Sequence, residues 1–90
     1  MSRLIDLITR IDEFDEEEVI FVKGPWEPGS EARLFRLTSE GRAPAEAEAL
    51  GFTYFLEVDV ARQVLDEFVD SAASEDRKCT RIIQYATYDA

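Results

Sequence analysis

The sequence predicts a small α+β domain in which three helices cover a three-stranded antiparallel sheet, in the order α-β-β-(short α)-β-α-α. Short β-branched and aromatic runs alternate with segments whose apolar residues recur every three or four positions. The first two runs are joined by a loop too short for a parallel crossover, so they should form a hairpin. Ninety residues, 46% of them hydrophobic, suffice for one domain over residues 1–90.

Four segments have the pattern of a helix. The first is predicted over residues 3–13, where apolar residues recur at spacings of three and four before an acidic run that opposes the helix dipole. A short helix is expected over residues 44–50, with proline at its first position and Gly51 after its end. A long amphipathic helix is predicted over residues 59–72, and Ser74 can cap a last one.

Three strands are predicted, over residues 19–22, 32–38 and 52–58. The first is a continuous β-branched and aromatic run, which is typical of a strand buried on both faces. The third alternates, so its apolar side chains should lie on one face of the sheet. We expect a single core that includes Phe52, Tyr54, Leu56, Leu65, Phe68, Ile82 and Ile83.

The charge balance excludes several classes of function. Twenty acidic and ten basic residues give a net charge of −10, and the chain has no histidine. We therefore expect no nucleic-acid partner, because such proteins need a positive surface. Histidine-based catalysis and histidine metal ligation are impossible. The four glycines fit neither of the common phosphate-binding motifs, so no nucleotide cofactor is expected.

The N-terminus carries a charge at Arg3 before any apolar run develops, unlike a secretory signal. The longest apolar stretches, residues 19–22 and 52–56, are too short to span a bilayer, and anionic lipid would repel the acidic surface. A single cysteine excludes an intrachain disulfide. We expect a cytoplasmic protein with no membrane partner.

Three strings along the chain, VKGPW (residues 22–26), SEA (30–32) and TYFLEV (53–58), resemble a family of short, acidic bacterial domains of unknown function. The C-terminal end is similar to that family as well, in Cys79, Ile83, Tyr85-Ala86 and Asp89-Ala90. The resemblance spans nearly the whole chain. It implies a complete domain in a bacterial cytoplasm, and it carries over no catalytic residue.

Two clusters invite a chemical interpretation that their context does not favour. The acidic run of residues 12–18 lacks the glycine of a calcium-binding loop and is interrupted by Phe14, so we expect a solvated turn and no metal. Cys79 has three basic neighbours that would favour a thiolate. It also lies on the apolar stripe of the last helix, and no histidine can activate it, so we expect it to be buried and inert.

Trp26 lies in a proline-stiffened loop and is flanked in sequence by Glu27 and Glu31. A tryptophan on a rigid loop is a typical interface anchor, because little conformational entropy is lost on binding. The alternative is that its indole folds back as a lid over the core, which a small domain needs. Both interpretations stay open at the level of sequence.

Glu57 ends the third strand beside the start of the long helix, where an outward side chain could line a small cleft. The alternative is a surface carboxylate that pairs across the sheet with Arg33 or Arg36, as cross-strand charge pairs commonly do.

The sequence thus favours a protein-binding module that is not an enzyme, such as an inhibitor or immunity-type partner of a basic protein. The predicted partner-binding residues are Trp26, Glu27, Glu31 and Glu57. The alternative function is a small ligand-binding or carboxylate-based enzymatic domain with a site near Glu57 and the Trp26 loop. The acidity could also serve solubility alone.

Overall fold

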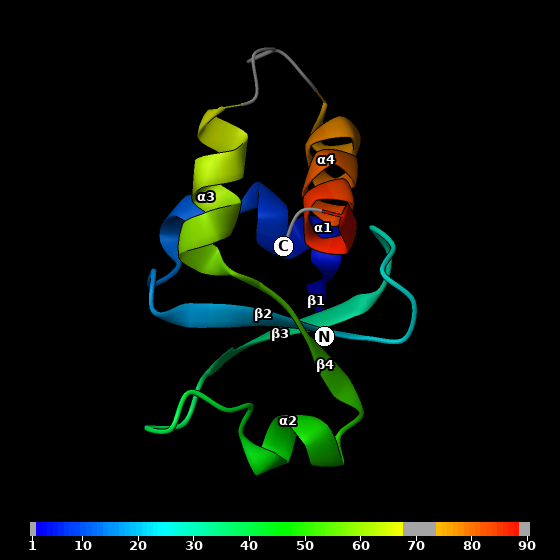
Figure 1. Cartoon of the computed structure of the whole chain (residues 1–90). Coiled ribbons are helices and arrows are strands. Elements are labelled where there is room, and N and C mark those ends of the chain that lie inside the picture. The colour runs from blue at the N-terminus through cyan, green and yellow to red at the C-terminus, as the bar shows by residue number, and fades with distance from the viewer. Residues whose placement is uncertain (1, 68–73, 89–90) are drawn as a thin grey trace.

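One antiparallel sheet of four strands, in the spatial order β1-β3-β2-β4, forms the centre of the computed structural model, which describes residues 2–67 and 74–88 (Figure 1). The strands are β1 (Ser2–Arg3), β2 (Glu18–Lys23), β3 (Glu31–Arg36) and β4 (Phe52–Glu57). The predicted α+β class and the β2–β3 hairpin are confirmed. The predicted number of three strands is wrong, because the two residues of β1 pair with Ala32 and Glu31 of β3. A strand of two residues is too short to show any alternation in the sequence.

The helices of the described residues are α1 (Leu4–Thr9), α2 (Ala45–Ala49), α3 (Val58–Asp66) and α4 (Glu75–Tyr88), and a 3₁₀ turn, η1 (Ile11–Glu13), follows α1. The described residues hold four helices rather than the three of the predicted fold class, because the short helix expected over residues 44–50 is formed as α2. The first helix is also shorter than the predicted residues 3–13. It ends where Arg10 leaves helical geometry, and its start is displaced because Arg3 belongs to β1. The predicted end of the third helix at Ala72 lies outside the described residues.

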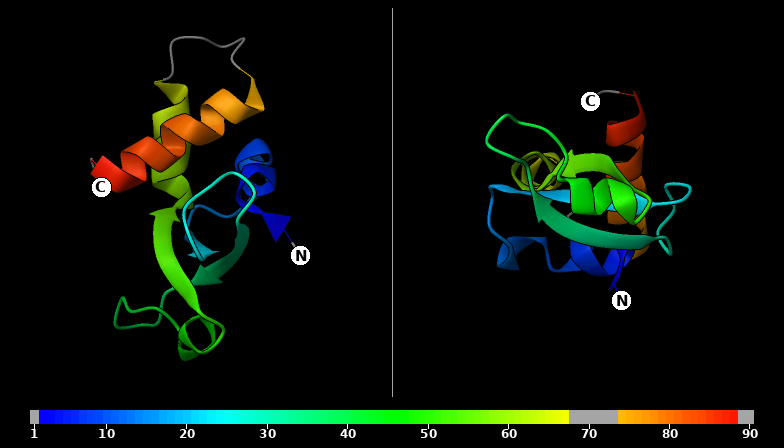
Figure 2. Two further views of the ribbon diagram at one scale, coloured as in Figure 1. Left: turned by 90° about the vertical axis from the view of Figure 1, so that its right-hand side faces the viewer. Right: turned by 90° about the horizontal axis from the view of Figure 1, so that it is seen from below.

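The two faces of the sheet are covered unequally (Figures 1 and 2). Helices α1, α3 and α4 lie on one face, which we call the three-helix face, and α2 lies on the other, which we call the α2 face. Strand β2 is buried on both faces as predicted. Its side chains alternate between the two cores, with Ile20 and Val22 on the three-helix face and Val19 and Phe21 on the α2 face.

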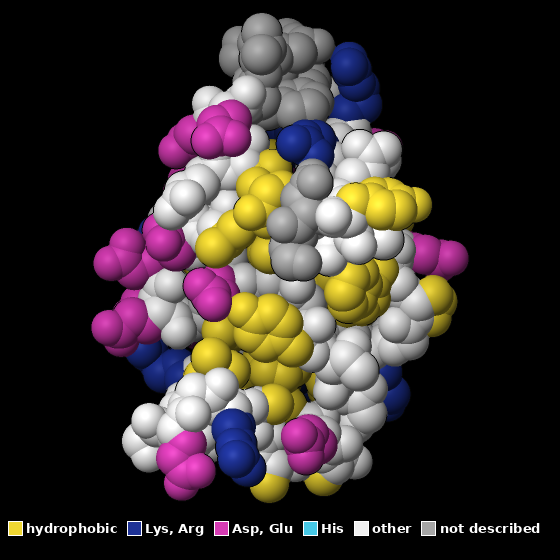
Figure 3. Space-filling view, in the orientation of Figure 1, with side chains coloured by type: hydrophobic (Ala, Val, Ile, Leu, Met, Phe, Trp, Pro, Cys, Tyr) yellow, Lys and Arg dark blue, Asp and Glu magenta, His cyan; other side chains and the backbone are white. Residues whose placement is uncertain are grey.

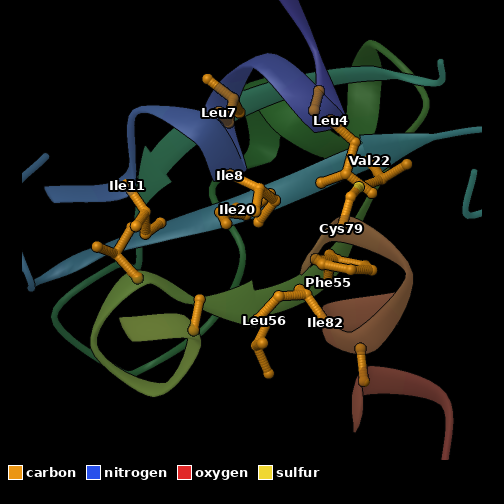
Figure 4. Close-up of a cluster of buried hydrophobic side chains, with 14 of the residues drawn as sticks. Leu4, Leu7, Ile8, Ile11, Ile20, Val22, Phe55, Leu56, Cys79 and Ile82 are labelled. Carbon is orange, nitrogen blue, oxygen red and sulfur yellow. The ribbon is translucent and has the colours of Figure 1, made fainter. Parts of the chain in front are cut away.

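The core on the three-helix face joins three helices to the sheet (Figure 4). Leu4 and Ile8 of α1 point toward Ile20 and Val22 of β2 in that view. The buried members of this core are Leu4, Leu7, Ile8, Ile11, Ile20, Val22, Ala32, Phe55, Leu56, Val58, Ala61, Val64, Cys79, Ile82 and Ala86. The core on the α2 face consists of Val19, Phe21, Ala47 and Phe52, with Phe35, Leu37 and Ala43 packed at its margin.

A β-bulge in β4 overturns the predicted alternation of that strand. Ile20 pairs with Leu56 and Phe21 pairs with Tyr54, so Phe55 is an extra residue between the two pairs. A bulge bends the strand and changes which side chains share a face. Phe55 and Leu56 therefore both enter the core of the three-helix face, while Tyr54 is left 44% exposed.

The prediction of one shared core is wrong for the same reason. Leu56 and Ile82 are buried on the three-helix face, and Leu65 and Ile83 are half-buried against it. Phe52 lies in the core of the α2 face. Phe68 falls outside the described residues. No helix in the described part of the chain has the length and apolar character needed to cross a membrane.

Candidate functional site

An open pocket of about 440 Å³ lies at one end of the sheet, on the α2 face. The turn before β2, the start of β2, the end of β3 and the end of β4 meet there. The lining residues are Glu16, Glu17, Val19, Arg36, Leu37 and Glu57. We call it the sheet-end pocket. Its floor is partly apolar and its rim is mostly acidic.

Among the described residues that line this pocket, Arg36 is the one cation, and two acidic residues of the turn before β2 form ion pairs with its guanidinium group. Its Nη2 lies 2.8 Å from Asp15 Oδ2, and its Nη1 lies 3.0 Å from Glu17 Oε2. The Asp15 carboxylate also accepts a hydrogen bond from the Glu17 backbone N–H at 2.9 Å. That bond, followed by the bonds from Arg36, lowers the pKa of Asp15. The network holds the turn against the end of β3.

Glu57 is exposed and lies opposite Val19 in the β2–β4 ladder. Its carboxylate accepts a hydrogen bond from the Tyr54 hydroxyl at 2.9 Å. Burial, and then the Glu57 carboxylate, raises the pKa of Tyr54 to about 12. The cross-strand pairing of Glu57 with Arg33 or Arg36 is not formed. Arg36 forms its ion pairs with Asp15 and Glu17 instead. The Cζ atom of Arg33 lies 5.6 Å from the centroid of the Phe52 ring.

Two carboxylates of the pocket rim have no cationic partner among the described residues: Glu16 and Glu57. Both residues are exposed. Because the pocket's own cation is already occupied, this end of the sheet keeps a net negative charge that a positively charged ligand group could neutralise.

Trp26 is half-buried, and its ring packs edge-on against Phe55, with centroids 4.9 Å apart and planes at 83°. It belongs to the margin of the core on the three-helix face. This geometry favours the lid interpretation, since edge-to-face packing of this kind adds to simple burial. The loop that carries Trp26 is anchored to α1, because the Leu4 N–H donates to the Ser30 carbonyl at 2.8 Å and the Ile5 N–H to the Pro28 carbonyl at 3.0 Å.

The structure separates the predicted site residues into two places. Trp26 packs on the three-helix face, whereas Glu57 lines a pocket with Val19 of the α2 face. Glu27 is exposed in the loop after Trp26, and Glu31 is half-buried at the start of β3, opposite Arg3. A single cleft between Glu57 and the Trp26 loop is therefore not formed.

Sequence reasoning missed two features of this region. It placed Tyr54 in the core, although the bulge leaves it exposed and bonded to Glu57. It also treated the acids of residues 12–18 as a solvated turn, without the pairing of Asp15 and Glu17 to Arg36. The spacing of Tyr54 and Glu57 gave no signal for the first, because residues three apart in a regular strand point to opposite faces, and nothing in the sequence marks the bulge. The pairing of Asp15 and Glu17 with Arg36 could not be predicted, because it depends on contacts between segments far apart in the chain.

Cys79 is buried in α4, as predicted. Burial, and then the nearby Asp76 carboxylate, raises the pKa of the Cys79 thiol to about 11, the reverse of what a nucleophile needs. Across residues 2–67 and 74–88, histidine, cysteine and carboxylate side chains form no group of three or more that could hold a metal ion.

Comparison of the chain with models of protein families, with curated proteins and with solved structures finds no match in any of the three. The resemblance to a family of short acidic bacterial domains therefore stays a prediction. Function has to be argued from the geometry of this chain alone, because a fold by itself does not specify an activity.

Proposed function

We propose that this protein is a binding module for a basic protein, acting as an inhibitor or immunity-type partner, and that the sheet-end pocket is a principal contact. The supporting observation is the unbalanced charge of the pocket rim. Glu16 and Glu57 have no cationic partner in the described structure, while Arg36 is held by Asp15 and Glu17. A lysine or arginine side chain of the partner supplies the missing charge.

The pocket offers apolar contact as well as charge. Leu37, which is half-buried in its lining, presents surface for the aliphatic stem of lysine or arginine, whereas Val19 is buried beneath. The acidic rim then contacts the charged end. Glu27 and Glu31 extend the negative field to the Trp26 loop and are proposed as further contacts, with Trp26 holding that loop in place.

The net charge of −10 acts at longer range than the pocket. It accelerates encounter with a basic protein, and added salt screens this effect. Short-range contacts then set the lifetime of the complex. The alternative, an enzymatic or ligand-binding site shared by Glu57 and the Trp26 loop, has no observation in its favour, because the two lie on opposite faces of the sheet.

The test is to compare two variants that remove the same two charges. Glu16→Gln with Glu57→Gln alters the pocket, whereas Asp66→Asn with Glu67→Gln alters exposed acids at the end of α3. The protein is first used to capture a partner from extract of its native cell, and association and dissociation are then measured with the purified partner at several salt concentrations.

We expect a basic partner whose association slows steeply between about 0.01 M and 0.15 M salt. The pocket variant should dissociate faster than wild type, and the α3 variant should not. Equal behaviour of the two variants would show that total charge matters and the pocket does not. Recovery of no basic protein would contradict the proposed function itself.

A further inference from the structure

The two edges of the sheet differ in whether another strand pairs with them. The outer edge of β3 is paired at its start by β1, through Ala32 and Glu31, and α1 follows directly from β1. Strand β4 is the other edge, and no strand of the described chain pairs with its outer side. An open edge presents unpaired N–H and C=O groups, which form a template for another strand.

Strand β4 has few of the features that normally protect an open edge. It contains no proline, lysine or arginine, and Glu57 at its end is its only charge. Tyr54, in its middle, is 44% exposed, and Leu50, just before it, is 41% exposed. Figure 3 shows hydrophobic side chains gathered on this side of the molecule, with acidic side chains along the left margin.

We propose, in a step that rests on the function proposed above, that an extended basic segment of the partner adds to the outer edge of β4 as a further strand. Backbone hydrogen bonds would supply affinity in this mode, and alternate side chains would supply selectivity. The side chains facing Tyr54 should be apolar, and those near the strand ends should be basic.

Charge identifies the occupant. Carboxylates lie beside both ends of β4: Glu57 at its end, and Glu48 in α2, which packs on β4. Lys23 of β2, which pairs with Phe52, is a cation at the start of the strand, so the excess of negative charge is greatest at the Glu57 end. A second copy of this chain would bring another net charge of −10 to the same edge. Like charges facing each other across a pair of strands are destabilising, and opposite charges stabilise it. A basic segment is therefore favoured over self-association.

The bulge at Phe55 defines where the added strand pairs. A bulge interrupts the regular ladder and twists the strand locally. Regular pairing is left to the stretch before it, Phe52–Tyr54, which continues toward α2. Because only this short stretch of β4 can pair regularly, β4 can remain an open edge without adding a series of further strands.

The probe is a short synthetic peptide with valines in its middle and lysines at both ends. A second peptide has the same sequence with alternate backbone nitrogens methylated, and a third has glutamate in place of lysine. Each is titrated into the intact protein while backbone amide NMR signals and amide exchange rates are recorded. Modifying the peptide rather than the protein leaves the fold untouched.

We expect the lysine–valine peptide to shift and protect the amides of Phe52–Tyr54, and methylation to weaken its binding by at least about tenfold, because several backbone hydrogen bonds are lost. The glutamate peptide should not bind. If the methylated peptide binds as well as its parent, the edge proposal is wrong and the charge-based function stands. If no lysine peptide shifts any amide, recognition of basic segments fails as well.

Discussion

The two faces of the sheet carry cores of very different size. The three-helix face buries a continuous core from α1, α3, α4 and the sheet, whereas the α2 face has a small core under a helix of five residues. The sheet-end pocket opens on this thinner side. This difference indicates that stability resides mainly on the three-helix face, which leaves side chains at the margin of the α2 face available for the proposed recognition of a partner.

The largest expected effect is the loss of Phe55, which is buried on the three-helix face and packs against Trp26. Phe55→Ala should lower the free energy of unfolding by about 3–5 kcal/mol, because it leaves a cavity that three helices cannot easily fill. Denaturant unfolding of the two proteins measures the difference. A loss below about 1 kcal/mol would mean that the surrounding core is loosely packed.

The matched substitution on the other face is Phe52→Ala, since Phe52 is buried to nearly the same extent. We expect a loss at the lower end of the same range, about 3 kcal/mol, because the thin layer of α2 can collapse into the space. The same unfolding experiment compares the two variants directly. A larger loss for Phe52 than for Phe55 would reverse the assignment of stability to the three-helix face.

Trp26 is the next test, because it is a half-buried residue at the margin of the larger core. Trp26→Ala should destabilise the protein by about 2 kcal/mol through lost burial and the lost edge-on contact with Phe55. Denaturant unfolding measures this loss of stability. The rate of dissociation from the captured partner is the second measurement. A stable variant that dissociates faster would identify an anchor and contradict the lid interpretation.

The smallest expected effect concerns Tyr54, on the exposed side of β4. Its pKa is raised from 10.0 to about 12, so the neutral phenol is favoured in the folded state. The associated stability is present below pH 10 and is lost as the pH rises through 12. Ultraviolet titration should show Tyr54 ionising late, and Glu57→Gln should lower its pKa part of the way, because burial is the larger cause. Ionisation of Tyr54 at its ordinary pKa would contradict the hydrogen bond to Glu57.

Several features could be predicted because they depend on residues close in sequence. The unbroken apolar run of residues 19–22 indicated a strand buried on both faces. In the structure, Val19 and Ile20 do lie in the cores on opposite faces of the sheet. The short loop after this run indicated the hairpin with β3. The stripe on α4 indicated that Cys79 would be buried beside Ile82.

The candidate site was less predictable. The sequence left Glu57 open between a residue beside a cleft and a cross-strand pair with Arg33 or Arg36, and in the structure it lines the sheet-end pocket. The rest of that pocket comes from segments far apart in the chain, and the choice of Arg36 between Glu57 and the acids of the preceding turn depends on their positions in space. Among many carboxylates, sequence spacing cannot distinguish these partners.

By itself, the sequence determined the α+β class, the hairpin, the helical stripes and the strongly acidic character of the protein, because periodicity and charge are local or additive properties. The tertiary structure decided the two-residue strand β1, the bulge at Phe55, the exposure of Tyr54 and the separation of Trp26 from Glu57. Each of these depends on register between strands brought together from distant parts of the chain. A shift of one residue moves a side chain to the opposite face of the sheet.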